Sequence, residues 1–89
     1  MNHVQKAIYN RRMKEADVFF IKAQKYILLG EYMKAKNLCY FAEREYKSAG
    51  NIAQDSNNKT LFEKAMNKAK EARDKLNEIT NILSNALHF

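Results

Sequence analysis

Apolar side chains in the first third of the chain recur at alternating intervals of four and three residues. They are Tyr9, Met13, Ala16, Phe20, Ala23 and Ile27. This spacing places them on one face of a helix, whereas a strand face would need every second residue. Gly30 follows, and glycine adopts the left-handed conformation that often comes just after a helix end. The pattern predicts a first helix over residues 4–29.

The same alternation continues in the middle third, after a very tight turn. The apolar positions are Tyr32, Ala35, Cys39, Ala42, Tyr46 and Ala49. Gly50 and Asn51 then form a second left-handed stop signal, so we predict a helix over 31–49. Residues 50–59 are rich in Asn, Asp, Ser and Gln, whose side chains compete for backbone hydrogen bonds, and this favours a loop.

The last third has the most regular pattern of all. Thr60 and Glu63 have the spacing of a capping box, with Thr60 as the N-cap, so we expect a helix over 60–86 that begins there or a few residues earlier. Its apolar positions are Phe62, Ala65, Ala69, Ala72, Leu76, Ile79, Leu83 and Ala86.

Three amphipathic helices in one chain bury their apolar faces most simply as an antiparallel three-helix bundle. The predicted fold is therefore all-α, with a single domain over 1–89 that we expect to be part of a larger protein. Alanine recurs on all three faces, which lets the helix axes approach closely. So regular a repeat could also extend a coiled coil with another chain at the ends of the first and third helices.

The composition agrees with a helical domain and says something about its setting. The chain of 89 residues has no proline, two glycines and one cysteine, so it has few signals for hairpin turns and cannot form an internal disulfide. Its longest apolar runs are far short of the ~20 residues of a membrane span. Residues 1–6 lack the apolar core of a signal peptide. We expect a cytoplasmic protein that reaches membranes only through its partners.

Sixteen lysine and arginine residues against ten acidic residues give a net charge of +6, which favours acidic partners. The basic residues alternate with acidic ones along every segment, as in Lys70-Glu71-Ala72-Arg73-Asp74. A nucleic-acid binder usually gathers them into one stripe or arm, so the pattern argues against nucleic acid. Most of these charges fit solvated helix faces with pairs four residues apart, for example Glu71 with Lys75.

The residue types that carry catalysis or bind metals are sparse. His3 and His88 lie near opposite ends of the chain, and no histidine or cysteine recurs at metal-ligand spacing. Cys39 falls on the apolar face of the second helix, which favours a small buried hydrophobe over a nucleophile. We therefore predict a protein that is not an enzyme and that needs no metal, cofactor or small-molecule substrate.

The segment from Ala23 to Ala42 resembles a known helical hairpin through Gly30, Tyr32, Ala35 and Ala42. The hairpin is shared by tetratricopeptide repeats and by MIT domains, the three-helix modules of microtubule-interacting and trafficking proteins. A tetratricopeptide repeat should recur after about 34 residues, and the third helical segment does not repeat the hairpin. The MIT resemblance fits better and covers roughly residues 13–80, because the mixed charges around the apolar face of the third segment are similar to that family.

The resemblance implies a module that binds helical or extended motifs of ESCRT-III-type proteins and recruits its host protein to endosomal membranes. MIT domains bind a helix between their second and third helices, or an extended peptide between the first and third. The implied site residues are Leu38, Phe41, Met66, Lys70 and Arg73. Lys70 stands where the family often has an acid, which implies a more acidic partner.

The chain also departs from the family where Lys36 and Glu43 follow Ala35 and Ala42, because those positions are often apolar. Two other functions stay open. One is a structural or oligomerising adaptor, of the tetratricopeptide or coiled-coil type. The other is a tubulin-binding domain of a severing ATPase, since acidic tubulin tails suit a basic module.

Overall fold

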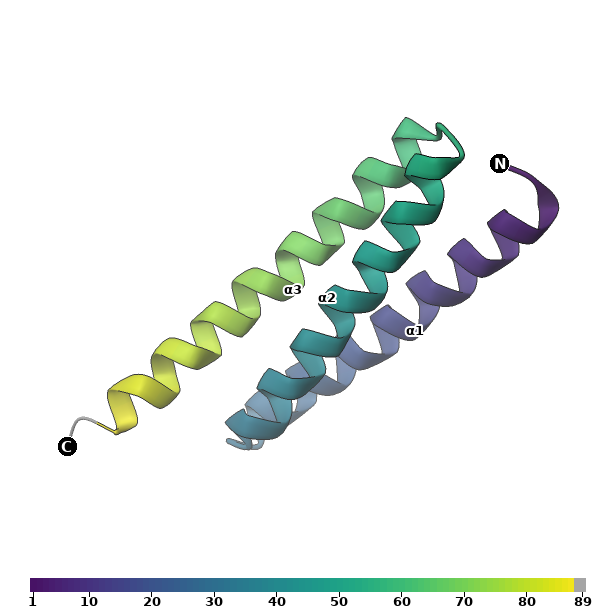
Figure 1. Cartoon of the computed structure of the whole chain (residues 1–89). Coiled ribbons are helices and arrows are strands. Elements are labelled where there is room, and N and C mark those ends of the chain that lie inside the picture. The colour runs from purple at the N-terminus through teal and green to yellow at the C-terminus, as the bar shows by residue number, and fades with distance from the viewer. Residues whose placement is uncertain (88–89) are drawn as a thin grey trace.

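The computed structural model describes residues 1–87 and confirms the predicted all-α three-helix bundle. Its helices are α1 (His3–Leu28), α2 (Tyr32–Asp55) and α3 (Lys59–Ala86), and no strand occurs among the described residues. Each helix runs antiparallel to the one before it, and α2 packs against both of the others (Figure 1). His88 lies outside the described residues.

The two ends of α1 are set by local signals. Gly30 has a φ of +74°, as expected for a residue that follows a helix end in the left-handed conformation. At the other end, the side chain of Asn2 accepts a hydrogen bond from the backbone N–H of Gln5 at 2.8 Å, and the Gln5 side chain accepts one from Asn2 at 3.0 Å. This capping box is a start signal that the sequence analysis did not identify.

The predicted end of the second helix at residue 49 is wrong, because α2 continues through Gly50 to Asp55. Ala53 lies four positions after Ala49, and both side chains are fully buried. Burial on this face offsets the roughly 1 kcal/mol by which glycine disfavours a helix interior. The true stop comes at Asn57, whose φ of 56° puts it in the left-handed region that asparagine tolerates.

The predicted ten-residue loop is therefore only a short turn, and the expected N-cap of the third helix is also wrong. Asn58 caps α3, since its side chain accepts a hydrogen bond from the backbone N–H of Leu61 at 3.1 Å. Thr60 already lies inside the helix. Glu63 does not reach back to it, and its carboxylate instead lies 3.9 Å from the ammonium of Lys59.

The buried apolar residues other than Ala53 lie at positions that the periodicity predicted, and they form two clusters. Ala86, also predicted on an apolar face, is exposed, because it lies in the last turn of α3, beyond the α1–α2 hairpin. The first is built around Tyr9, Met13, Ala16, Ala42, Tyr46, Ala49, Ala53, Ala65, Ala69 and Ala72. The second is built around Ala23, Ala35, Cys39, Leu76 and Ile79. Alanine dominates the contact surfaces, so the helices pack closely and the larger side chains fill the space between them.

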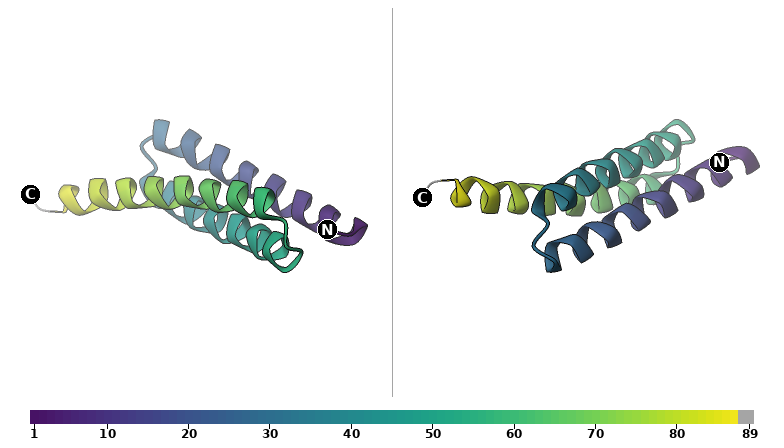
Figure 2. Two further views of the ribbon diagram at one scale, coloured as in Figure 1. Left: turned by 90° about the horizontal axis from the view of Figure 1, so that it is seen from above. Right: turned by 90° about the horizontal axis from the view of Figure 1, so that it is seen from below.

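Helices α1 and α3 meet directly near the end of the bundle that holds the α2–α3 turn. The hydroxyl of Tyr9 donates a hydrogen bond to the carbonyl of Leu61 at 3.0 Å, and the carboxylate of Asp17 lies 3.5 Å from the ammonium of Lys68. Toward the other end α3 diverges from the α1–α2 hairpin, and its last turns extend past it (Figure 2).

Lys75 pairs with Glu78 at 3.1 Å, so the expected pair with Glu71 does not form. Within residues 1–87, none of the helices combines the length and the apolar character that crossing a membrane requires.

Candidate functional site

The five residues implied as a binding site divide between two sides of α2. The ring of Phe41 lies 5.8 Å from that of Phe19, measured between centroids, which places Phe41 beside α1. Leu38 lies one turn before it and is partly buried against the second core cluster. Met66, Lys70 and Arg73 lie on α3. The structure therefore does not bring the five together.

Met66 packs across the α2–α3 contact at a position without a side chain. A Cβ added to Gly50 would lie 3.0 Å from the sulfur of Met66, so the thioether occupies the space that glycine leaves free. Met66 is partly buried as a result. Gly50, which suggested a helix stop in the sequence, serves instead as a close-approach point inside α2.

Glu43 is the one buried charged residue among residues 1–87, and it is the partner of Arg73. Its side chain is 4% exposed. The Arg73 guanidinium donates to both carboxylate oxygens, at 2.8 and 2.9 Å, and the ammonium of Lys47 lies at 3.2 Å. Two of the N–H groups of Arg73 are thus committed within the bundle. Sequence reasoning noted Glu43 only as a departure from the family pattern and did not assign it a partner. The signal that it missed is that a buried acid requires a cation, here a basic residue on the facing helix.

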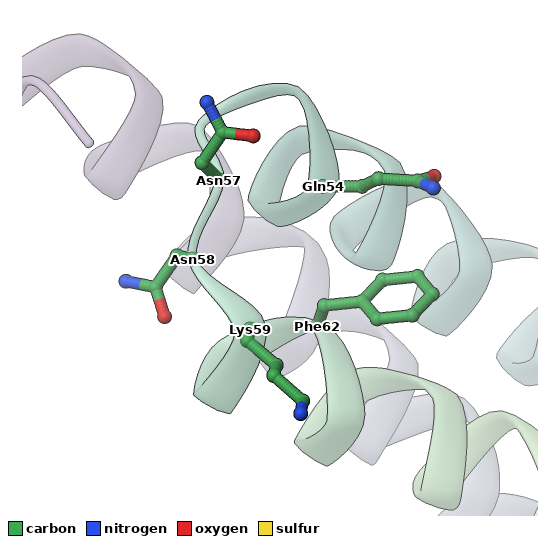
Figure 3. A pocket seen from close by; sticks show the side chains of 5 residues that line it. All are labelled: Gln54, Asn57, Asn58, Lys59 and Phe62. Atoms are coloured by element: carbon green, nitrogen blue, oxygen red, sulfur yellow. The ribbon is translucent and has the colours of Figure 1, made fainter.

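A cavity of about 240 Å³ opens beside the turn between α2 and α3. It is bordered by Gln54, Asn57, Asn58, Lys59 and Phe62. In Figure 3 the side chains of Gln54 and Phe62 lie across from each other, one from each helix. Because Met66 follows Phe62 by one helical turn, the two apolar side chains share one flank of α3. We call Phe62, Met66, Lys70 and Arg73, with Gly50 opposite, the α2–α3 face.

A second apolar surface lies on the other side of α2, where it meets α1. It consists of Val18, Phe19, Tyr40 and Phe41, which we call the aromatic patch. The rings of Tyr40 and Phe41 are 5.8 Å apart, and Val18, Tyr40 and Phe41 are each more than two-fifths exposed. Sequence reasoning singled out Phe41 alone among these four residues. Val18 and Tyr40 fall outside the periodic positions, so no sequence signal marked them.

Basic side chains surround the aromatic patch. A hollow of about 370 Å³ beside it is bordered by Arg11, Lys14, Glu15, Val18 and Phe19. The guanidinium of Arg44 lies 5.8 Å from the centre of the Tyr40 ring, in the range of a cation–π contact.

The buried titratable groups are placed for packing rather than chemistry. Burial raises the pKa of the Cys39 thiol to about 11, against a smaller opposing effect of Lys75, so the thiol stays protonated near neutral pH. Burial also raises the pKa of Tyr46, whose hydroxyl donates a hydrogen bond to Asp17. Among residues 1–87, no three His, Cys, Asp or Glu side chains gather as metal ligands would.

Comparison of the chain with models of protein families, with curated proteins and with solved structures finds no match. The functional argument therefore rests on the residues and contacts described above.

Proposed function

We propose that the chain is a non-catalytic interaction module that binds a short helical motif of a partner on the α2–α3 face. The observation that carries this proposal is the cavity beside Phe62, one turn from Met66 on the same flank of α3. The resemblance of residues 23–42 to MIT domains supports an ESCRT-III-type tail as the partner. By binding this tail, the module would recruit its host protein to the membranes on which ESCRT-III-type proteins act in trafficking.

The shape of the bundle favours a helical ligand over an extended one. All three helices satisfy their own backbone hydrogen bonds, so their surface offers side chains and no unpaired strand edge. A partner helix laid along α2 and α3 would become a fourth member of the bundle. Its leucines would bury against Phe62 and Met66, and each Å² removed from water contributes about 25 cal/mol.

The charges on this face favour an acidic motif. Lys59 and Lys70 are exposed. Lys59 pairs with the exposed Glu63, and Lys70 pairs with the exposed Asp74. Surface pairs of this kind contribute little, so a partner carboxylate can replace either acid at small cost. Arg73 is less available, because its guanidinium is held by Glu43.

A matched pair of substitutions tests the apolar contact. We expect Met66→Gln to lower the affinity for an acidic leucine-containing peptide from an ESCRT-III-type tail about tenfold, or ~1.4 kcal/mol, because the thioether contact is lost. Met33→Gln makes the same change on an exposed part of α2, and it should leave affinity unchanged. Isothermal titration calorimetry measures both, with thermal unfolding as a check of folding. Equal affinities for the two variants would contradict the proposal.

The charge contribution is tested by Lys70→Glu. We expect weaker binding of the same peptide, with the largest difference at low salt, because exposed charges are screened beyond about 10 Å at 0.1 M ionic strength. If the loss does not depend on salt, the acidic part of the motif does not lie near Lys70.

A specific observation also favours the alternative of an oligomerising adaptor. Leu28, Leu29 and Met33 are exposed around the α1–α2 turn, and Leu87 is exposed beyond the end of α3. Apolar ends of this kind could be covered by a second copy. Light scattering separates the two functions, since the adaptor should be a dimer and the interaction module a monomer.

A further inference from the structure

We infer that the aromatic patch is a second docking surface, which binds an acidic amphipathic helix of another protein independently of the α2–α3 face. The patch presents Val18 and Phe19 from α1 and Tyr40 and Phe41 from α2. Phe41 is 44% exposed although its ring contacts both Phe19 and Tyr40. Clustered aromatic side chains beside a hollow are typical of the centre of a protein interface.

The surrounding charges specify the partner. Among residues 1–87, the side chains of Lys14 and Arg44 form no ion pair, and Arg11 reaches Glu15 only at 3.9 Å. The patch is thus bordered by the three cations Arg11, Lys14 and Arg44, and Glu15 is the one exposed acid among them. Acidic side chains flanking the apolar residues of a partner helix would complete these pairs, and rim charges of this kind accelerate association.

The same charges argue against a second copy of this chain. In a symmetric dimer the patch would face itself, so Arg11, Lys14 and Arg44 would oppose their own equivalents. Juxtaposed like charges are unfavourable at an interface. Single-stranded RNA is also disfavoured, because Glu15 borders the hollow and would repel phosphate groups. The Phe19 and Phe41 rings are inclined by 40° to each other rather than parallel as successive stacking platforms would be.

The Phe19–Phe41 part of the patch and the α2–α3 face lie on different sides of α2, and Tyr40 lies between them, about 60° around the helix from Glu43. Phe41 belongs to the patch, and Glu43, which holds Arg73, belongs to the other side, about 200° away around the helix. One partner helix cannot cover both. The module can therefore hold two partner helices at once, with α2 between them.

The test uses the full chain labelled with ¹⁵N and a synthetic amphipathic peptide. The peptide carries leucine at the a and d positions of the heptad and glutamate at the flanking positions. We expect its addition to shift the backbone amide signals of residues 14–19 and 40–44. Phe41→Asp should weaken binding at these amides at least tenfold, whereas Met33→Asp, an exposed position on the same helix, should not. A peptide with lysine in place of glutamate should not bind the patch.

Charge reversals separate this inference from the proposed function without disturbing the core. Lys14→Glu should weaken binding at the patch amides alone, and Lys70→Glu should weaken it at the α2–α3 amides alone. If only the α2–α3 amides respond to the peptide, the patch is no docking surface and the proposed function stands. Preferred binding of an oligouridine to the patch, or self-association that Phe41→Asp abolishes, would also overturn the inference.

Discussion

The two sides of α2 hold their neighbouring helices by different means. Toward α3, the Glu43 carboxylate is almost completely buried and forms ion pairs with Arg73 and Lys47. Toward α1, the carboxylate of Glu45, two residues later, lies 3.1 Å from the Arg12 guanidinium, but the two side chains are 22% and 36% exposed. Two acids in almost adjacent positions thus sit in opposite environments.

The difference shows how burial changes what an ion pair does. A buried carboxylate cannot lose its cation without being left desolvated and unpaired, so the Glu43 pair locks α3 in one position. The Glu45 pair is partly open to solvent, so water can replace part of what is lost when it breaks, and breaking it costs less. The α1 side instead relies on ring contacts that remain partly open to solvent, and it therefore has apolar surface left for a partner.

The core beneath both sides sets the largest expected effect. Leu76→Ala should lower the free energy of unfolding by ~2 to 5 kcal/mol, because it leaves a cavity among closely packed alanines. Leu38→Ala, at a partly buried position, should cost less. Urea denaturation measures both, and an equal loss for the two variants would mean that Leu76 is no more deeply packed in the second cluster than Leu38.

The buried pair comes next. Arg73→Met should lower the free energy of unfolding by about 2 kcal/mol, because Glu43 keeps only the half-exposed Lys47 as a cation. A double variant, Glu43→Leu with Arg73→Met, should recover part of the loss, since no unpaired charge then remains. If the double variant is as unstable as the sum of the single ones, the two residues do not act as a pair.

The partly exposed pair of Arg12 and Glu45 on the α1 side should matter less. We expect Arg12→Met to cost under about 1 kcal/mol, and the cost should shrink as salt is added. The same denaturation measurement at low and high salt checks this. A cost as large as that of Arg73→Met would remove the contrast between the two sides of α2.

The smallest expected effect concerns the glycine in α2. Alanine at position 50 gains up to ~1 kcal/mol in helix propensity, but its Cβ would press on the sulfur of Met66. We expect Gly50→Ala to be close to neutral in the wild type and stabilising by ~0.5 to 1 kcal/mol when Met66 is alanine. Equal effects in both backgrounds would mean that Met66 does not rest on Gly50.

The candidate sites could be only partly predicted. The sequence marked Phe41, Met66, Lys70 and Arg73, yet three of these have partners that no local pattern shows. Met66 packs over Gly50 on α2. Arg73 is held by Glu43, thirty positions earlier. Phe41 contacts Phe19 on a different helix from the one that carries Met66. The cavity beside Phe62 depends on a turn that the sequence analysis placed within a longer loop.

The sequence alone determined that the chain forms three helices, and it determined which face of each is buried over residues 4–28, 32–49 and 60–83. Both follow from backbone geometry, because residues three and four apart share a side of any α-helix. The left-handed turn at Gly30 is local in the same sense. Only the tertiary structure decided that α2 continues through Gly50, where burial of Ala53 outweighs the glycine, and that Glu43 and Glu45 face different helices. Those outcomes depend on how the helices pack across long sequence separations, which no local pattern encodes.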